Sequence, residues 1–186
     1  MHNIFIISGP SGCGKGTIVE GLISNSDLNL YWAKSYTTRP KRESDNTEQK
    51  YIFVTTDKFK VLENEGEILE SNYYNGNWYG TSKSEIENNI ESHNIIKDID
   101  VNGGMAYRKI FPNAKLIFIE SSIDDIKSRL VKRGQNTEVE ISQRLDSAKK
   151  ELEMAKDYDY IINNPEGYPE KAIQNIADII TKQIRS

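Results

Sequence analysis

The sequence predicts an α/β protein in which a central parallel sheet is flanked by helices. Three observations indicate this class: a run of β-branched residues leads straight into a glycine-rich loop, a helical pattern follows the loop, and short apolar runs return later between helical segments. With 186 residues the chain suits one compact domain that buries a substantial core.

The first expected element is a strand. Residues Ile4–Ile7 form a continuous apolar run, which is typical of a strand buried on both faces of a parallel sheet. The loop "GPSGCGKGT", residues 9–17, follows directly. Apolar residues then recur at helical spacing, so the local order is strand, loop and helix; they are Ile18, Val19, Leu22 and Ile23.

Between residues 34 and 82 the pattern changes to short segments rich in aromatic residues and threonine, such as "SYTTRP", "KYIFV" and "WYGTS". This composition predicts a small mixed-sheet insertion. One helix is expected from Asp57 to Glu65, where Gly66 ends it. Ser82 with Glu85 three residues later predicts the start of another helix, where the chain returns to the core.

Further core strands are expected at 95–96, 116–119 and 160–162, and a final helix at 169–184. A helix pair around "KRGQNTEVE" predicts a lid, because Ser122 and Asp125 form a cap pattern and Gly134 interrupts the helical run. The buried stripe of the second lid helix is expected at Leu145, Ala148, Leu152 and Ala155. The single domain, 1–186, then divides into a core of 1–33, 83–123 and 150–186, an insertion of 34–82 and a lid of 124–149.

Charge and cysteine content exclude several classes of protein. A net charge of −4 and a pI near 5.4 argue against a surface built mainly to bind nucleic acid. The single cysteine, Cys13, excludes an internal disulfide framework and fits a reducing compartment. The early apolar run is too short for a membrane span and has no basic leader. We therefore expect a cytoplasmic protein with no membrane or nucleic-acid partner.

The glycine loop has the spacing of a phosphate-binding loop that cradles a nucleoside triphosphate. Glycines let backbone N–H groups surround phosphate oxygens, the following helix N-terminus adds positive potential, and the lysine reaches the outer phosphates. The candidate phosphate-binding residues are Gly9, Pro10, Ser11, Gly12, Cys13, Gly14, Lys15, Gly16 and Thr17.

Gly16 occupies the slot where such loops usually carry a hydroxyl that binds magnesium. Thr17, one residue later, is expected to contact a phosphate oxygen rather than the metal. Mg²⁺ would then rest mostly on substrate phosphates and water, which this ion accepts readily. This arrangement favours phosphate transfer between nucleotides over a regulatory switch.

A second phosphate site is predicted in the insertion. Arg39 and Arg42 lie close in sequence to Tyr51, and two guanidinium groups with a phenol are suited to hold a phosphate. Taken alone, these arginines would more often be solvated surface charges. Together with the glycine loop they provide a donor site and an acceptor site, which in-line phosphoryl transfer requires.

The sequence resembles the guanylate kinases over nearly its whole length. The motifs that carry this resemblance occur in the family's order and spacing: "GPSGCGKGT", "SYTTRPKR", the Tyr51 segment, "GEILE", "WYGTS", "DIDVNGG", "RLVKRGQNTEVEISQRL" and "YDYIINN". The resemblance implies the fold of a P-loop nucleoside monophosphate kinase, with 34–82 as the GMP-binding insertion. It also implies transfer of the γ-phosphoryl group from ATP, with Mg²⁺, to GMP.

The resemblance also implies roles for individual residues in the acceptor site. Ser35, Glu70 and Thr81 match positions that read guanine, with Glu70 accepting from the ring N–H and the exocyclic amine. Adenine has no such donor pair, so AMP would leave the carboxylate unsatisfied. The residues that match GMP-phosphate ligands are Arg39, Arg42, Tyr51 and Tyr79.

Asp98 and Asp100 follow a predicted core strand, at the edge where open α/β sheets bind ligands. Their spacing by two predicts one shared face, although capping of the strand end is an alternative. The resemblance implies that Asp98 contacts GMP, while Asp100 organises Lys15, the guanine site or magnesium-bound water. No direct protein ligand of the metal is assigned.

Arg133 and Arg144 match the arginines of the family's lid, which close over the triphosphate and, with Lys15 and Arg39, act in catalysis. Asn163 matches the position beside the adenine ring. Three features depart from the family pattern: Asn164 replaces a usual Asp, Lys97 stands at a usually apolar strand position, and Asn102–Gly104 replaces a glutamine-glycine pair.

Two alternatives remain open at this stage. The chain could be a catalytically silent guanylate-kinase-like module that binds phosphorylated peptides, against which the presence of Lys15, Arg39, Arg133 and Arg144 argues. It could also be a related kinase for another phosphorylated acceptor, such as a sugar phosphate. The expected partners are ATP and GMP, and the expected state is a monomer or homodimer.

Overall fold

The computed structural model of the chain describes residues 2–41, 50–74, 76–134 and 137–185. Its core is a five-stranded parallel sheet in the order β2-β7-β1-β8-β9. The predicted α/β class and its parallel sheet are confirmed. The strands are β1 (Ile4–Ser8), β2 (Leu30–Trp32), β7 (Asn94–Asp98), β8 (Lys115–Glu120) and β9 (Tyr160–Asn163).

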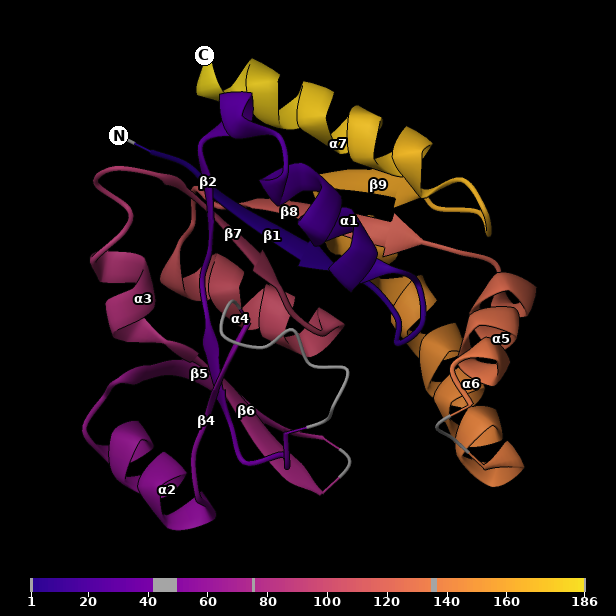
Figure 1. The fold of residues 1–186 in the computed structure, drawn as a ribbon, viewed down its shortest axis with the longest axis horizontal. Helices are drawn as coiled ribbons and strands as arrows, with labels where there is room; N and C mark the ends of the chain where they lie inside the picture. Colours follow the sequence, from indigo (N-terminus) through magenta and orange to yellow (C-terminus); the bar gives the residue numbers. More distant parts are fainter. Residues whose placement is uncertain (1, 42–49, 75, 135–136, 186) are drawn as a thin grey trace.

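Helices cover both faces of the core sheet. Helices α1 (Lys15–Ile23) and α7 (Pro169–Ile184) pack on the face that carries Ile7, and α4 (Val101–Ile110) packs on the face that carries Ile6 (Figure 1). Both isoleucines are fully buried. Alternation along β1 therefore supplies both hydrophobic cores, as the uninterrupted apolar run predicts.

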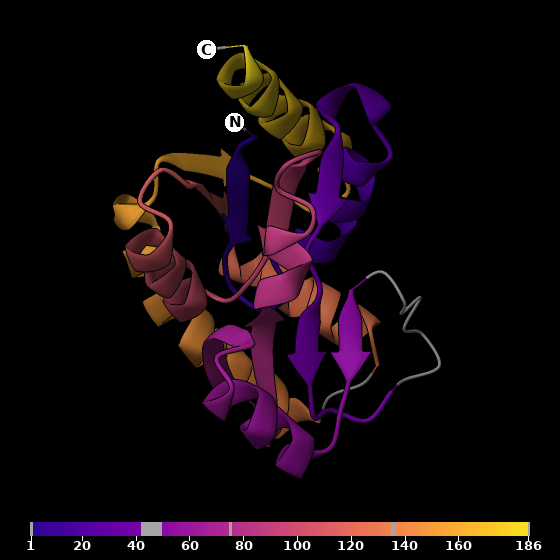
Figure 2. The ribbon, with the colours of Figure 1, turned by 90° about the vertical axis from the view of Figure 1, so that its left-hand side faces the viewer.

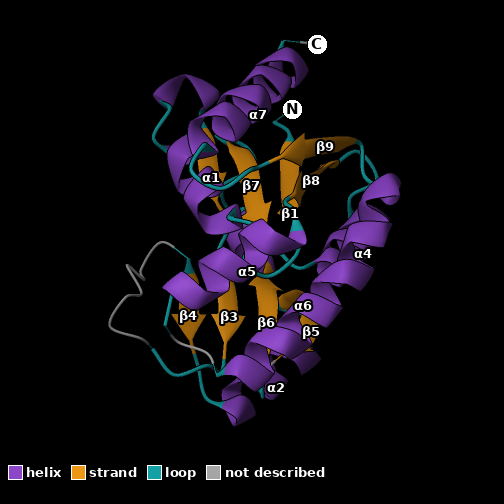
Figure 3. Cartoon of the chain, turned by 90° about the vertical axis from the view of Figure 1, so that its right-hand side faces the viewer, coloured by secondary structure: helices purple, strands orange, loops and turns teal. Residues whose placement is uncertain are grey.

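A second sheet lies between residues 34 and 82, with the order β4-β3-β6-β5. Strands β3 and β4 are parallel and the other pairs are antiparallel, so the predicted mixed sheet is confirmed. Figure 3 shows the two sheets as separate groups of strands. The elements of this segment are β3 (Ser35–Thr37), β4 (Tyr51–Phe53), α2 (Thr56–Asn64), β5 (Ile68–Tyr74) and β6 (Asn77–Ser82).

Helix α2 packs on the second sheet, where its Phe59 ring stacks on Trp78 with centroids 5.8 Å apart. Gly66 has φ of 73° just after α2, as expected of a glycine that ends a helix. Figure 2 shows α2 and α7 at opposite ends of the molecule. Helix α3 (Lys83–Glu87) then begins at the expected cap, because the Ser82 side chain accepts a hydrogen bond from the Glu85 N–H.

Helices α5 (Ile123–Lys132) and α6 (Glu138–Glu153) form an arm that leaves the core separately from the second sheet (Figure 1). Their packing rests on Ile126, Leu130 and Ala148. Helix α6 continues beyond residue 149, the predicted lid boundary. None of the helices in the described ranges combines the length and hydrophobicity that a membrane crossing requires.

Candidate active site

The glycine loop connects β1 to α1 and has a backbone that side chains would disrupt. Gly9, Gly12 and Gly14 have φ of 147°, 91° and 100°. A Cβ atom would lie 2.4 Å from the Ile119 carbonyl oxygen at Gly9, and 2.5 Å from the Asn164 Nδ2 at Gly14. The loop therefore requires glycine for both conformation and space, and it delivers the chain to the positive N-terminal end of α1.

Lys15 lies against the loop that precedes it. Its Nζ donates to the carbonyl oxygens of Gly9 at 2.5 Å and Pro10 at 3.1 Å. The neighbouring Cys13 is fully buried, and burial raises the pKa of its thiol. The thiol therefore stays protonated and packs as a small apolar group.

Arg129 and Asn164 hold the loop from behind. The Arg129 guanidinium donates to the carbonyl oxygens of Cys13 at 3.0 Å and Asn164 at 2.8 Å. The Asn164 side chain donates to the same Cys13 oxygen at 2.7 Å. These bonds tie α5 and the end of β9 to the loop, so its shape is set by three segments of the chain.

The predicted lid arginines differ in position. The Arg144 Nη1 donates to the Ser11 Oγ at 3.0 Å, so α6 already places one arginine at the glycine loop. Arg133 is exposed at the C-cap of α5. Thr17 and Asn163 are also exposed, in the first turn of α1 and at the end of β9. The structure thus brings Arg144, but not Arg133, into contact with the loop.

An arginine and two tyrosines meet on the second sheet. Arg39 is only 8% exposed, and its guanidinium carbon lies 5.4 Å from the centre of the Tyr51 ring. Tyr79 packs edge-on against Tyr51 with ring centroids 6.2 Å apart. The fourth residue predicted for this cluster, Arg42, lies outside the described residues.

The three residues expected to read a base also lie together. Ser35 and Thr81 are opposite one another in the β3–β6 register. The Thr81 Oγ1 donates to the Glu70 Oε1 at 2.6 Å, and the Thr81 N–H donates to the same oxygen at 3.2 Å. Burial raises the pKa of Glu70 to about 7, although Thr81 and Lys97 act against that shift.

Asp98 ends β7 and is held by the insertion. Its carboxylate pairs with the Lys50 Nζ at 2.6 Å and accepts from the Trp32 Nε1 at 3.0 Å. Burial opposes ionisation of Asp98, but the charges of Lys50 and Lys97 outweigh burial and lower its pKa to about 2.

Asp100 lies beyond the end of β7, so the strand alternation that predicted a face shared with Asp98 does not reach it. It caps α4 by accepting from the Gly103 N–H at 2.9 Å, and it accepts from the Asn72 Nδ2 at 2.8 Å. Both aspartates therefore join the end of β7 to residues of the insertion, with different partners.

The comparisons with known proteins agree with this geometry. The guanylate kinase family model matches residues 1–183. The chain belongs to the guanylate kinase family. It is 36% identical over 182 residues to the guanylate kinase of Halalkalibacterium halodurans, covering 97% of this chain and 88% of that protein. For the guanylate kinase of Nitrosomonas europaea the identity is 37%, over 97% of this chain and 89% of that protein.

A solved structure supports the same family. The crystal structure of guanylate kinase from Anaplasma phagocytophilum superposes with a TM-score of 0.80 at 26% sequence identity, covering 98% of this chain and 86% of that one. The predicted fold of the guanylate kinases, with a central parallel sheet flanked by helices and a mixed sheet, is therefore confirmed.

Several residues that shape the site of this guanylate kinase family member carry no motif that would predict their role. Lys50 pairs with Asp98, Asn72 binds Asp100, and Arg129 braces the glycine loop. The only signal in the sequence was proximity, since Lys50 precedes Tyr51 and Arg129 shares a helix with Arg133. Their partners are distant in sequence, so the fold alone brings them together.

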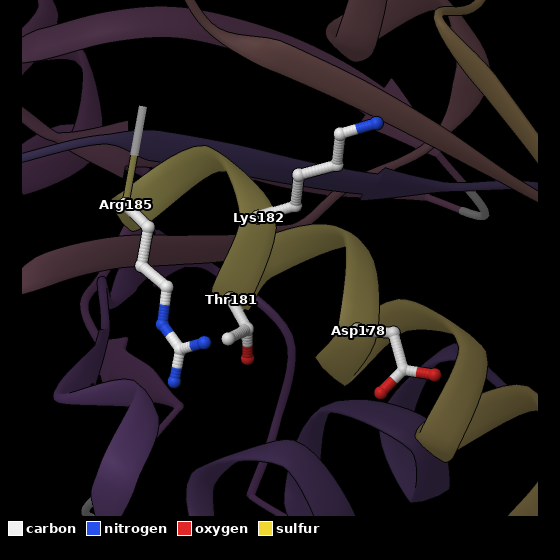
Figure 4. A pocket seen from close by; sticks show the side chains of 4 residues that line it. All are labelled: Asp178, Thr181, Lys182 and Arg185. Carbon is white, nitrogen blue, oxygen red and sulfur yellow. The ribbon is translucent and has the colours of Figure 1, made fainter.

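A hollow of about 410 Å³ lies on α7, lined by Asp178, Thr181, Lys182 and Arg185 (Figure 4). Three of these side chains lie on α7 and Arg185 is its C-cap residue, and none belongs to the glycine loop or to the second sheet. Among the described residues, no group of three or more His, Cys, Asp or Glu could hold a metal ion.

Proposed function

We propose that this chain catalyses in-line transfer of the γ-phosphoryl group of ATP to the phosphate of GMP, giving ADP and GDP. The observation that carries the proposal is the contact between the second sheet and the end of β7, next to the glycine loop. The Lys50–Asp98 pair and the Asn72–Asp100 hydrogen bond make this contact. A Cβ atom built at Gly16 would lie 3.8 Å from the Lys50 Nζ, which supports the proximity of the two sites.

On the donor side, the glycine loop and Lys15 would bind the triphosphate at the start of α1. The Arg144 contact with Ser11 supports a role for α6 in neutralising charge on the transferred group. Arg133 would join it when the arm closes. Thr17 would bind a phosphate oxygen, and Asn163 would lie beside the adenine ring.

On the acceptor side, Arg39, Tyr51 and Tyr79 would hold the GMP phosphate together with Arg42. Glu70, supported by Thr81, would accept from the ring N–H and amine of guanine, while Ser35 would contact the same base edge. Aromatic neighbours stabilise the Arg39 guanidinium. Asp98 would contact GMP, and Asp100 would support the guanine site.

Magnesium fits this site as a companion of ATP. Gly16 supplies no hydroxyl at the slot where the ion is usually bound, so substrate phosphates and water would provide most of its ligands, with Asp100 acting through water. When bound, Mg²⁺ would neutralise phosphate charge.

The reaction needs positioning more than proton transfer. The phosphate of GMP is already ionised, so no strong general base is required. We propose that the insertion, 34–82, and the lid, 124–149, close on the core of 1–33, 83–123 and 150–186, which would exclude water and limit ATP hydrolysis.

A coupled assay of ADP release tests the proposal directly. The acceptors would be GMP, dGMP, AMP, UMP, CMP and ribose phosphates, each with ATP and Mg²⁺. Turnover with GMP and dGMP, and little with the others, is expected. Preference for a ribose phosphate would indicate a kinase for another acceptor, and absence of turnover with every acceptor would indicate a binding module.

A further inference from the structure

Lys97 is a buried charge that the proposed reaction does not use. It lies in the middle of β7 and is 1% exposed. Its ammonium donates to the Ala33 carbonyl oxygen at 2.9 Å and to the Ser35 Oγ at 2.5 Å. Within the described ranges no carboxylate forms an ion pair with it, and Asp98 and Glu70 act on it only through space. Burying a charge costs free energy of desolvation, and here the hydrogen bonds to Ala33 and Ser35 have to offset that cost.

We propose that Lys97 is a positioning residue for base recognition: it fixes the direction of the Ser35 hydroxyl proton, so that Ser35 acts as a hydrogen-bond donor to the 6-oxo group of guanine. This inference rests on the proposed function, because it assigns the atom of GMP that Ser35 contacts. Lys97 acts through Ser35 and does not touch the substrate.

The proton count supports this direction. A serine hydroxyl has one proton and two lone pairs, whereas an ammonium group can only donate. Since the Lys97 ammonium donates to the Ser35 Oγ, the hydroxyl proton must point away from it. The positive charge also makes the Ser35 oxygen a poorer acceptor and its O–H a better donor.

The surroundings of Ser35 support the 6-oxo group of guanine as the acceptor of that proton. Thr81 is opposite Ser35 in the sheet and donates to Glu70, which leaves the carboxylate to accept from the base. A donor at Ser35 and an acceptor at Glu70 match the guanine edge, which offers a carbonyl oxygen beside the ring N–H and amine. An adenine edge, with an amino group at position 6, would meet a donor and a positive charge at Ser35.

Comparison of GMP with 6-thio-GMP isolates this contact. The two nucleotides share the ring N–H, the amine and the phosphate, and they differ in the atom at position 6, where sulfur is a weak acceptor. The ratio of kcat/KM for GMP to kcat/KM for 6-thio-GMP therefore cancels effects on Glu70 and on ATP. The variants are Lys97→Met, Ser35→Ala and the double variant. Lys34→Met, which removes a charge from the adjacent residue, is the matched control.

The wild-type protein is expected to prefer GMP. Lys97→Met and Ser35→Ala should each lower the ratio about tenfold, and the double variant should lower it no further, because both changes remove the same hydrogen bond. Lys34→Met should keep the wild-type ratio. If Lys97→Met does not fold, as judged by thermal melting, Lys97→Leu removes the donor with a shorter apolar side chain.

Two outcomes would overturn the inference. An unchanged ratio in folded Lys97→Met or Lys97→Leu would leave the lysine with a packing role only, and an unchanged ratio in Ser35→Ala would show that Ser35 does not donate to the base. Failure of the wild-type protein to turn over GMP would instead contradict the proposed function, so the two failures are distinguishable.

Discussion

Lys15 is the one charged side chain in the glycine loop, residues 9–17. Replacing it by Met in the proposed kinase should lower kcat at least about 100-fold, because a preorganised cation in the cleft is lost. The melting temperature should change little, since among the described residues the hydrogen bonds of the ammonium go to the Gly9 and Pro10 carbonyl oxygens and the Cys13 sulfur, all within the loop. Lys109→Met, at an exposed position of α4, is the control. Equal turnover in a folded Lys15→Met protein would refute the role of Lys15.

Glu70 should make GMP use dependent on pH. Burial raises its pKa to about 7, so the fraction in the ionised, accepting form falls as the pH drops below 7. The kcat/KM for GMP is then expected to fall up to about tenfold for each pH unit below 7, while the KM for ATP stays nearly constant. Steady-state kinetics between pH 5.5 and 8.5, with each nucleotide varied in turn, measures both.

The matched variant for this pH dependence is Glu70→Gln, which cannot ionise. Its kcat/KM for GMP should be low over the whole pH range. The profile should show only the titration of the GMP phosphate itself, whose second pKa is about 6. Lys97 and Asp100 act on Glu70 with opposite signs in the wild-type site. If the wild-type and Gln profiles had the same shape, Glu70 would not be the titrating group.

At the scale of elements, Arg129 connects helix α5 to the glycine loop and to Asn164. Its guanidinium binds carbonyl oxygens of the loop and of Asn164, so Arg129→Met would leave buried acceptors without a charged donor. We expect a loss of about 2 kcal/mol in the free energy of unfolding and a severalfold rise in the KM for ATP. Chemical denaturation and kinetics with Lys127→Met, an exposed change on α5, as control would test this. No change in either quantity would show that the loop holds its shape without the brace.

Local chemistry made most elements predictable from the sequence. The Ser82 and Ser122 caps, the glycine after α2 and the uninterrupted apolar run of β1 are each encoded within a few residues. Strand β2 is different, because it has three residues and no alternating pattern, and in the described part of the chain it pairs with the distant β7 alone. Its existence depends on the finished sheet.

At the scale of the whole molecule, the site depends on contacts between distant residues, which local patterns do not encode. Lys97 and Ser35 are 62 positions apart, and the contact of Arg144 with Ser11 spans 133 positions. The motifs indicated that Lys15, Arg39 and Glu70 belong to nucleotide sites, because residue type and order carry that information. The partners of Lys50 and Lys97 follow from the fold, so the sequence could only mark Lys97 as a lysine at a usually apolar strand position.

Two arms of the molecule, the second sheet with α2 and the α5–α6 helices, should approach each other most closely when both nucleotides are bound. Arg144 already contacts the glycine loop, whereas Arg133 on the same arm is exposed, so the proposed closure would have to bring Arg133 to the phosphates. Dyes at Lys60→Cys on α2 and Val139→Cys on α6 report the distance between the arms, and both positions are exposed. The native Cys13 is fully buried, so labelling is selective.

Energy transfer should rise modestly with GMP or a non-hydrolysable ATP analogue alone, and most with both together, since phosphate charge from each side favours closure. The same dyes on the Lys15→Met background should show a weaker response to the ATP analogue and an unchanged response to GMP. A distance that stays constant with both nucleotides would mean that the phosphates meet without closure, and water would then have to be excluded by the substrates themselves.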